Sequence, residues 1–137
     1  LTRALDGWSD LDSLLARWAQ LGAAQHSAIL RACGLLARQL HGARQVHGCF
    51  YPKHIFLRAT GDCYEAQLID LEKTRPLLFG MRDRVKDLEP LQRRAPQWSE
   101  ADLRQLLAAY LDQPTDSSLL DSWLSRLTAR RSHKETR

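Results

Sequence analysis

Histidine, cysteine and acidic residues gather in one stretch of the sequence, between positions 47 and 70. His47, Cys49 and His54 lie in a polar segment that precedes a short apolar run, and Asp70 directly follows a second run of this kind. If the two runs form a β-hairpin, its outer ends meet, and we expect His47, His54 and Asp70 to lie close together. Imidazoles that face a strand-terminal carboxylate can form a metal or phosphate site.

The hairpin that would position these side chains is predicted over residues 55–69. Ile55–Arg58 and Tyr64–Ile69 have the pattern of short strands, and Thr60–Asp62 supplies residues typical of a turn. Two strands alone are only marginally stable, so helices must pack against them.

Helical periodicity accounts for most of the remaining chain. Predicted helices cover residues 10–20, 23–41, 82–95, 100–112 and 117–129. The fold class is therefore mainly α with a small β-hairpin.

The ends of these helices are predicted from individual residues. Ser9 is expected to cap the first helix, and Ser99 the fourth, with Asp102 at the third helical position. Gly42 is expected to terminate the second helix. Pro90 predicts an interruption or a fresh start of the third helix. Inside the second helix, Cys33 lies in the apolar stripe and is predicted to be a core residue.

The composition favours one globular domain with anionic partners. The 137 residues suit a single domain, and no apolar run approaches the ~20 residues that span a bilayer. The net charge of +4 favours nucleotides, phosphorylated sugars or a lipid surface as partners. Nucleic acid is disfavoured, because basic and aromatic residues do not alternate in any one stretch.

The three cysteines form no C-x-x-C pair, which fits a reducing compartment. Residues 130–137 are predicted to form a flexible basic tail.

The polar stretch resembles the catalytic core of protein-kinase-like enzymes. His47-Gly48-Cys49 with His54 five positions later follows the frame of a kinase catalytic loop, and Asp70 follows the hairpin as the metal-binding aspartate does. More narrowly, the stretch from His47 to Arg75 is similar to the lipopolysaccharide kinase family, which includes the heptose and Kdo kinases and InaA-type proteins. In that family a histidine commonly stands at the position of His54.

The resemblance implies a domain plan. Residues 1–8 would be the hinge that joins the two kinase lobes, and residues 9–129 the C-terminal lobe. Within the lobe, residues 47–54 would form the catalytic loop and residues 70–80 the metal loop. The N-terminal lobe, with its glycine-rich loop and lysine, would precede Leu1, so the isolated chain is expected to be inactive.

The resemblance also implies roles for single residues. Asp70 would hold Mg²⁺ against the phosphates of ATP, and His54 would lie beside the phosphates or a second metal as a hydrogen-bond partner or a ligand. His47 would orient the loop, Lys53 would neutralise the transferred phosphoryl group, and Asp87 would be architectural. The plainer alternatives are that Asp70 is a turn acceptor, His47 a structural histidine and Lys53 an ordinary exposed lysine.

Cys49 departs from the family pattern, because it stands where active kinases have the catalytic aspartate. A thiol is mostly protonated at neutral pH and accepts hydrogen bonds weakly. A general base is worth about 10²–10⁴-fold in rate, so Cys49 predicts a slow kinase, a different base or a pseudokinase.

Two functions and one unrelated alternative follow from the sequence. The first is an ATP- and Mg²⁺-dependent sugar kinase acting on a lipid-linked acceptor, in the cytoplasm or peripherally at the inner face of the cytoplasmic membrane. The second is a catalytically weak or inactive pseudokinase that serves as a binding or scaffold module. The alternative that ignores the resemblance is a zinc site formed by His41, His47, Cys49 and His54. The spacing of these four residues fits no usual pair of zinc ligands.

Overall fold

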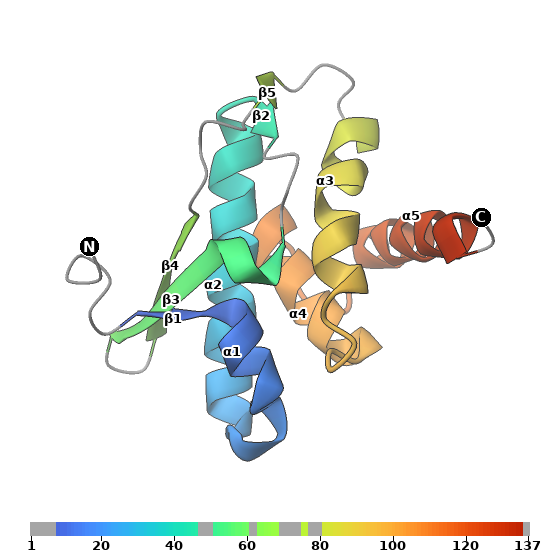
Figure 1. The fold of residues 1–137 in the computed structure, drawn as a ribbon. Helices are drawn as coiled ribbons and strands as arrows, with labels where there is room; N and C mark the ends of the chain where they lie inside the picture. The colour runs from blue at the N-terminus through green and yellow to red at the C-terminus, as the bar shows by residue number, and fades with distance from the viewer. Residues whose placement is uncertain (1–7, 47–50, 61–62, 69–74, 77–80, 136–137) are drawn as a thin grey trace.

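The computed structural model describes residues 8–46, 51–60, 63–68, 75–76 and 81–135. Helix α2 (Ala23–Gly42) lies at the centre, with a β-sheet on one side and helices α3 (Met81–Arg93) and α4 (Glu100–Leu111) on the other (Figure 1). Helix α5 (Ser118–Glu135) packs against α3 and α4. The predicted mainly helical fold with a small β-hairpin is confirmed.

The first helix is shorter than predicted and begins at a different cap. Helix α1 (Leu11–Ala16) is capped by Asp10, whose carboxylate accepts a hydrogen bond from the Ser13 amide at 3.1 Å. A separate 3₁₀ turn, η2 (Trp18–Gln20), follows. The prediction of Ser9 as the N-cap is wrong, because Ser9 and Asp10 are extended and form strand β1 (Ser9–Asp10).

The predicted hairpin is present and carries a third strand. Strand β3 (Ile55–Thr60) pairs with β4 (Cys63–Leu68) in antiparallel register, and β1 pairs with the other edge of β3. Ile55 and Leu57 are buried on the face of β3 that meets the helices. A two-residue strand such as β1 is too short to show an alternating pattern, which is why the sequence did not predict it.

A second, two-stranded sheet joins segments that the sequence placed in loops. Strand β2 (Gln45–Val46) pairs with β5 (Arg75–Pro76) in antiparallel register. The turn from α2 into β2 uses Arg44, whose φ of 63° lies in the left-handed region. Gly42, predicted to terminate α2, instead remains helical, and Ala43 is the C-cap.

The later helices confirm one predicted cap and correct two boundaries. The Ser99 hydroxyl accepts from the Asp102 amide at 3.2 Å, and the Asp102 carboxylate accepts from the Ser99 amide at 3.0 Å, which confirms the capping box. Helix α3 continues through Pro90 without the predicted interruption. Helix α5 continues to Glu135, so the backbone of residues 130–135 is helical rather than a tail. Arginine, lysine and glutamate there favour helix, and no glycine or proline stops it.

Helices α2 and α4 approach so closely at Gly34 that their backbones touch. A Cβ atom at position 34 would lie 2.9 Å from the Ala109 Cβ and 3.1 Å from the Tyr110 amide nitrogen, and closer still to the Leu106 carbonyl oxygen. The preceding residue in α2, Cys33, is fully buried, as predicted, and burial raises its pKa to about 12. The core between these helices is therefore tightly packed and apolar.

Candidate functional site

Two pairs of strands border the two segments that contain the predicted site residues. Val46 in β2 is paired with Arg75 in β5, and Ile55 in β3 is paired with Leu68 in β4. The segment that follows β2 and the segment that precedes β5 therefore connect the same two strand pairs. His47, Cys49 and Asp70 lie outside the described residues, and so does the predicted approach of Asp70 to His54.

The described part of the predicted catalytic loop is a single 3₁₀ turn, η3 (Pro52–His54). The His54 amide donates to the Tyr51 carbonyl oxygen at 2.9 Å, and Pro52 is buried at the first position of the turn. This turn separates the two predicted site residues, because Lys53 is exposed while His54 is only 9% exposed. His54 thus belongs to the interior of the site and Lys53 to its surface.

Aromatic and cationic side chains gather around Tyr51, and we call Tyr51, Lys53 and Arg94 the Tyr51 cluster. The Arg94 guanidinium lies 4.3 Å from the centre of the Tyr51 ring, and the Lys53 Nζ lies 5.9 Å from it. The Tyr51 ring is tilted against the His54 ring, with 5.8 Å between their centres. The ring therefore connects the buried imidazole to two cations at the surface.

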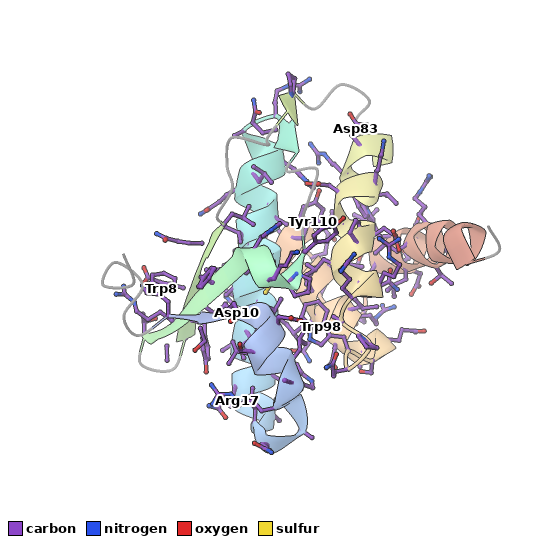
Figure 2. The ribbon with its side chains drawn as sticks, in the orientation of Figure 1. Trp8, Asp10, Arg17, Asp83, Trp98 and Tyr110 are labelled. Atoms are coloured by element: carbon purple, nitrogen blue, oxygen red, sulfur yellow. The ribbon has the colours of Figure 1, made fainter. Side chains whose placement is uncertain are left out.

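A buried polar chain lies at the junction of α2, α3 and α4. His41 Nδ1 is 2.6 Å from the Tyr110 hydroxyl, and His41 Nε2 is 2.8 Å from Asp87 Oδ2. His41, Asp87 and Tyr110 are each less than 5% exposed. Figure 2 shows Tyr110 in the space between α2 and α3. Buried polar groups are costly unless they are hydrogen-bonded, and these three groups bond one another.

The Tyr110 hydroxyl can donate to His41 Nδ1, and the proton on His41 Nε2 is then donated to the Asp87 carboxylate. Burial raises the pKa of Tyr110, opposed by the nearby Arg84, so Tyr110 stays protonated and can act as this donor.

His41 and Tyr110 are the polar residues that the sequence analysis did not recognise. Tyr110 lies in the predicted helix 100–112 and was given no separate role, and His41 entered only the zinc alternative. Their signal was present in the spacing, since His41 continues the buried face of α2 four residues after Ala37 and seven after Gly34. Both His41 ring nitrogens are occupied, so it cannot serve as a zinc ligand. Within the described ranges, no group of three or more candidate ligands could hold a metal ion.

Asp87 has the architectural character that the resemblance implied, and its partner is identified. Its carboxylate accepts from His41, on the helix that leads directly into β2 and the predicted catalytic loop.

Comparison with known proteins places the chain in a family. Residues 1–110 match the model of the Lipopolysaccharide kinase (Kdo/WaaP) family, so the chain belongs to that family. The predicted family and the kinase-like fold are both confirmed.

Two particular relatives show how far the likeness extends. Protein InaA of Escherichia coli (strain K12) is 34% identical over 83 residues, which is 61% of this chain and 38% of InaA. A solved structure titled "WaaP in complex with acyl carrier protein" matches with a TM-score of 0.72 and 22% identity, over 90% of this chain and 57% of WaaP. The chain thus spans well under two thirds of either relative. In the part of the chain that the structure describes, no helix is long and apolar enough to cross a membrane.

Proposed function

We propose that this chain is the C-terminal lobe of an ATP- and Mg²⁺-dependent kinase that phosphorylates a sugar hydroxyl of the lipopolysaccharide core. The observation that supports this most is the pairing of β2 with β5 and of β3 with β4. Along the chain, the segment that carries Cys49 leads from β2 to β3, and the segment that carries Asp70 leads from β4 back to β5, so both segments start and end at the same two strand pairs. Family membership over residues 1–110 supports the same activity.

The available side chains suit Mg²⁺ held together with a nucleotide. Magnesium is usually bound by one or two carboxylates, waters and substrate phosphates rather than by an all-protein cage. Asp70 would supply the carboxylate. Bound Mg²⁺ would neutralise charge on the phosphates during transfer. The nearly buried His54 suits a hydrogen bond to a phosphate better than metal coordination, because imidazole is a poor ligand for this hard ion.

In the proposed reaction the acceptor oxygen attacks the γ-phosphorus of ATP, and the bond from that phosphorus to the bridging oxygen breaks to release ADP. The hydroxyl proton passes from the acceptor to water. His47 would orient the loop that positions the hydroxyl, and Lys53 would contribute positive charge at its surface. Cys49 stands where a carboxylate base would accept the proton, and a neutral thiol accepts it poorly.

Cys49 favours a second candidate function, that of a pseudokinase. In this candidate the same lobe binds Mg-ATP or a protein partner without appreciable transfer. The two candidates share the nucleotide site and differ in turnover, so binding and turnover must be measured separately.

Nucleotide binding is tested by titrating Mg-ATP into the full-length protein that contains this chain, with calorimetric detection. We expect binding in the wild type and its loss in Asp70→Ala, because the metal loses its carboxylate. Asp116→Ala removes an exposed carboxylate elsewhere and is the matched control. Wild-type binding that Asp70→Ala leaves unchanged would contradict the proposal.

Cys49→Asp tests whether the missing carboxylate limits the chemistry. We expect this variant to raise phosphate transfer or ATP turnover by about 10²-fold or more, because a general base contributes at least this much. A variant that binds Mg-ATP normally and shows no gain would favour the pseudokinase.

We also propose the cellular setting and the limits of the isolated chain. A lipid-linked acceptor would place the protein in the cytoplasm, peripherally at the inner face of the membrane. The isolated chain should bind ATP poorly, because the glycine-rich loop and lysine of kinases belong to the other lobe.

A further inference from the structure

Trp8, Arg58 and Glu65 line up across the three-stranded sheet, and we call these three residues the Trp8 row. Arg58 in β3 is the register partner of Glu65 in β4. At the other edge of β3, Ser9 is paired with Leu57, so one further step along this register places Trp8 opposite Arg58. Figure 2 shows Trp8 beside the strands of this sheet. The row therefore runs from the start of β1 to β4, with Arg58 in the middle.

The contacts within the Trp8 row hold the Arg58 side chain on both sides. Its Nε donates to Glu65 Oε1 at 3.1 Å, and its Nη2 donates to the same oxygen. The guanidinium carbon lies 4.9 Å from the centre of the Trp8 ring, within the range of a cation–π contact. A guanidinium can make both contacts together, because its N–H groups lie in its plane and its face can meet a ring.

The Trp8 row lies on the face of the sheet that is turned away from the helices. Side chains alternate between the two faces along a strand, and Leu57 is buried against the helices, so Arg58 points to the opposite face. Arg58 and Glu65 are exposed, and Trp8 is half-buried. Exposed ion pairs and cation–π contacts contribute little to the stability of a fold. The row is therefore not part of what holds the core together.

Strand β1 is by itself a weak attachment for the start of this lobe. It consists of two residues, Ser9 and Asp10, which pair with β3 at two positions. Ordering each backbone residue costs conformational entropy, so so short a pairing frays easily. The contact of Trp8 with Arg58 extends the attachment by one residue, to the position at which the predicted hinge (residues 1–8) ends.

We propose that the Trp8 row is a positioning device, which holds the end of the predicted hinge against the sheet and so sets the direction in which the hinge leaves this lobe. The inference rests on the proposed function, in which the glycine-rich loop belongs to the other lobe and Asp70 to this one. Mg-ATP then binds tightly only while the hinge keeps the two lobes aligned. Loss of the row lowers the fraction of aligned molecules and leaves the lobe folded. Arg58 is a positioning residue that acts through Trp8.

The test uses the full-length protein that contains this chain, with the variants Arg58→Gln and Trp8→Ala and the conservative variants Arg58→Lys and Trp8→Phe. Mass spectrometry measures amide hydrogen exchange in the peptides that cover Trp8 and β1. Calorimetry measures Mg-ATP binding, and circular dichroism melting checks the fold. Arg38→Gln is the matched control, because Arg38 is another exposed arginine in an ion pair, with its Nη2 3.9 Å from the Asp112 carboxylate.

We expect Arg58→Gln and Trp8→Ala each to raise the exchange rate of the β1 amides by roughly 2- to 5-fold, because an exposed cation–π contact is worth about this factor. Mg-ATP binding should weaken by a similar factor, while the melting temperature stays that of the control. The double variant should be no worse than either single variant, since both remove the same contact. Arg58→Lys keeps a cation and Trp8→Phe keeps a ring, so both should lie closer to the wild type.

Three results would overturn the inference. The first is unchanged exchange at β1 in both Arg58→Gln and Trp8→Ala, and the second is raised exchange with Mg-ATP binding equal to that of the wild type. The third is an equal effect in Arg38→Gln, which would assign the change to net charge. A wild type that does not bind Mg-ATP would refute the proposed kinase function, and exchange at β1 would then decide by itself whether the row holds the end of the hinge.

Discussion

The buried polar chain and the Tyr51 cluster each contain a tyrosine, yet they differ in how their polar groups are satisfied. At the junction of α2, α3 and α4, Asp87, His41 and Tyr110 each meet a protein partner at hydrogen-bond distance and exclude solvent. At the surface, Lys53 and Arg94 meet the Tyr51 ring and, in the residues described, no carboxylate. The first arrangement is buried and stabilises the fold, whereas the second is open to solvent.

The largest effect is expected from breaking the buried polar chain at its charged end. Asp87→Ala removes the acceptor of His41 Nε2 and leaves a buried donor unpaired, so it should lower the free energy of unfolding by about 3 kcal/mol. Urea denaturation measures this cost. Asp87→Asn can still accept the bond and should lose less. A cost below ~1 kcal/mol for Asp87→Ala would mean that the chain is not a structural unit.

A smaller effect is expected at the other end of the same chain. Tyr110→Phe keeps the ring that packs edge-on against Trp123 but removes the hydroxyl that bonds His41. Its cost should be about 1 kcal/mol in the same urea experiment, because one neutral hydrogen bond is lost. Combined with Asp87→Ala, the two costs should not add, since both bonds end on His41. Simple additivity would contradict the linked arrangement.

The smallest effect on stability is expected in the Tyr51 cluster. Arg94→Gln removes an exposed charge and one cation–π contact, so the free energy of unfolding should change by less than about 0.5 kcal/mol. Thermal melting is sufficient to detect a larger change. Destabilisation as great as that of Tyr110→Phe would show that the cluster holds the fold together, and the contrast between the two regions would fail.

The sequence predicted those features that depend on local patterns. The apolar stripes gave the helices, and the Ser99–Asp102 cap and the hairpin were predicted because their signals lie within a few neighbouring residues. The pairing of β2 with β5 was not predicted, because it joins residues 30 positions apart through strands of two residues. Gly42 was predicted to end a helix and Pro90 to interrupt one, and both predictions are wrong, because tertiary packing keeps the chain helical at these positions.

The sequence predicted which residues form the candidate site, but not which side chains surround them or how deeply each is buried. The resemblance identified His54 and Lys53, but only the fold shows that one is buried and the other exposed. Arg94 had no signal near the loop, because it reaches Tyr51 from the end of α3. His41 and Tyr110 lie 69 positions apart, so their hydrogen bond depends on how α2 and α4 pack.

The close contact at Gly34 determines more than local packing. His41 lies seven residues further along α2, on the same face, and Tyr110 lies one turn beyond Leu106 in α4. The missing methyl group at position 34 therefore sets the interaxial distance at which the His41 imidazole, two turns along α2, can hydrogen-bond the Tyr110 hydroxyl. Any side chain at position 34 would push α2 and α4 apart. It would thereby disturb His41 and the end of α2 that leads into the predicted catalytic loop, without contacting that loop.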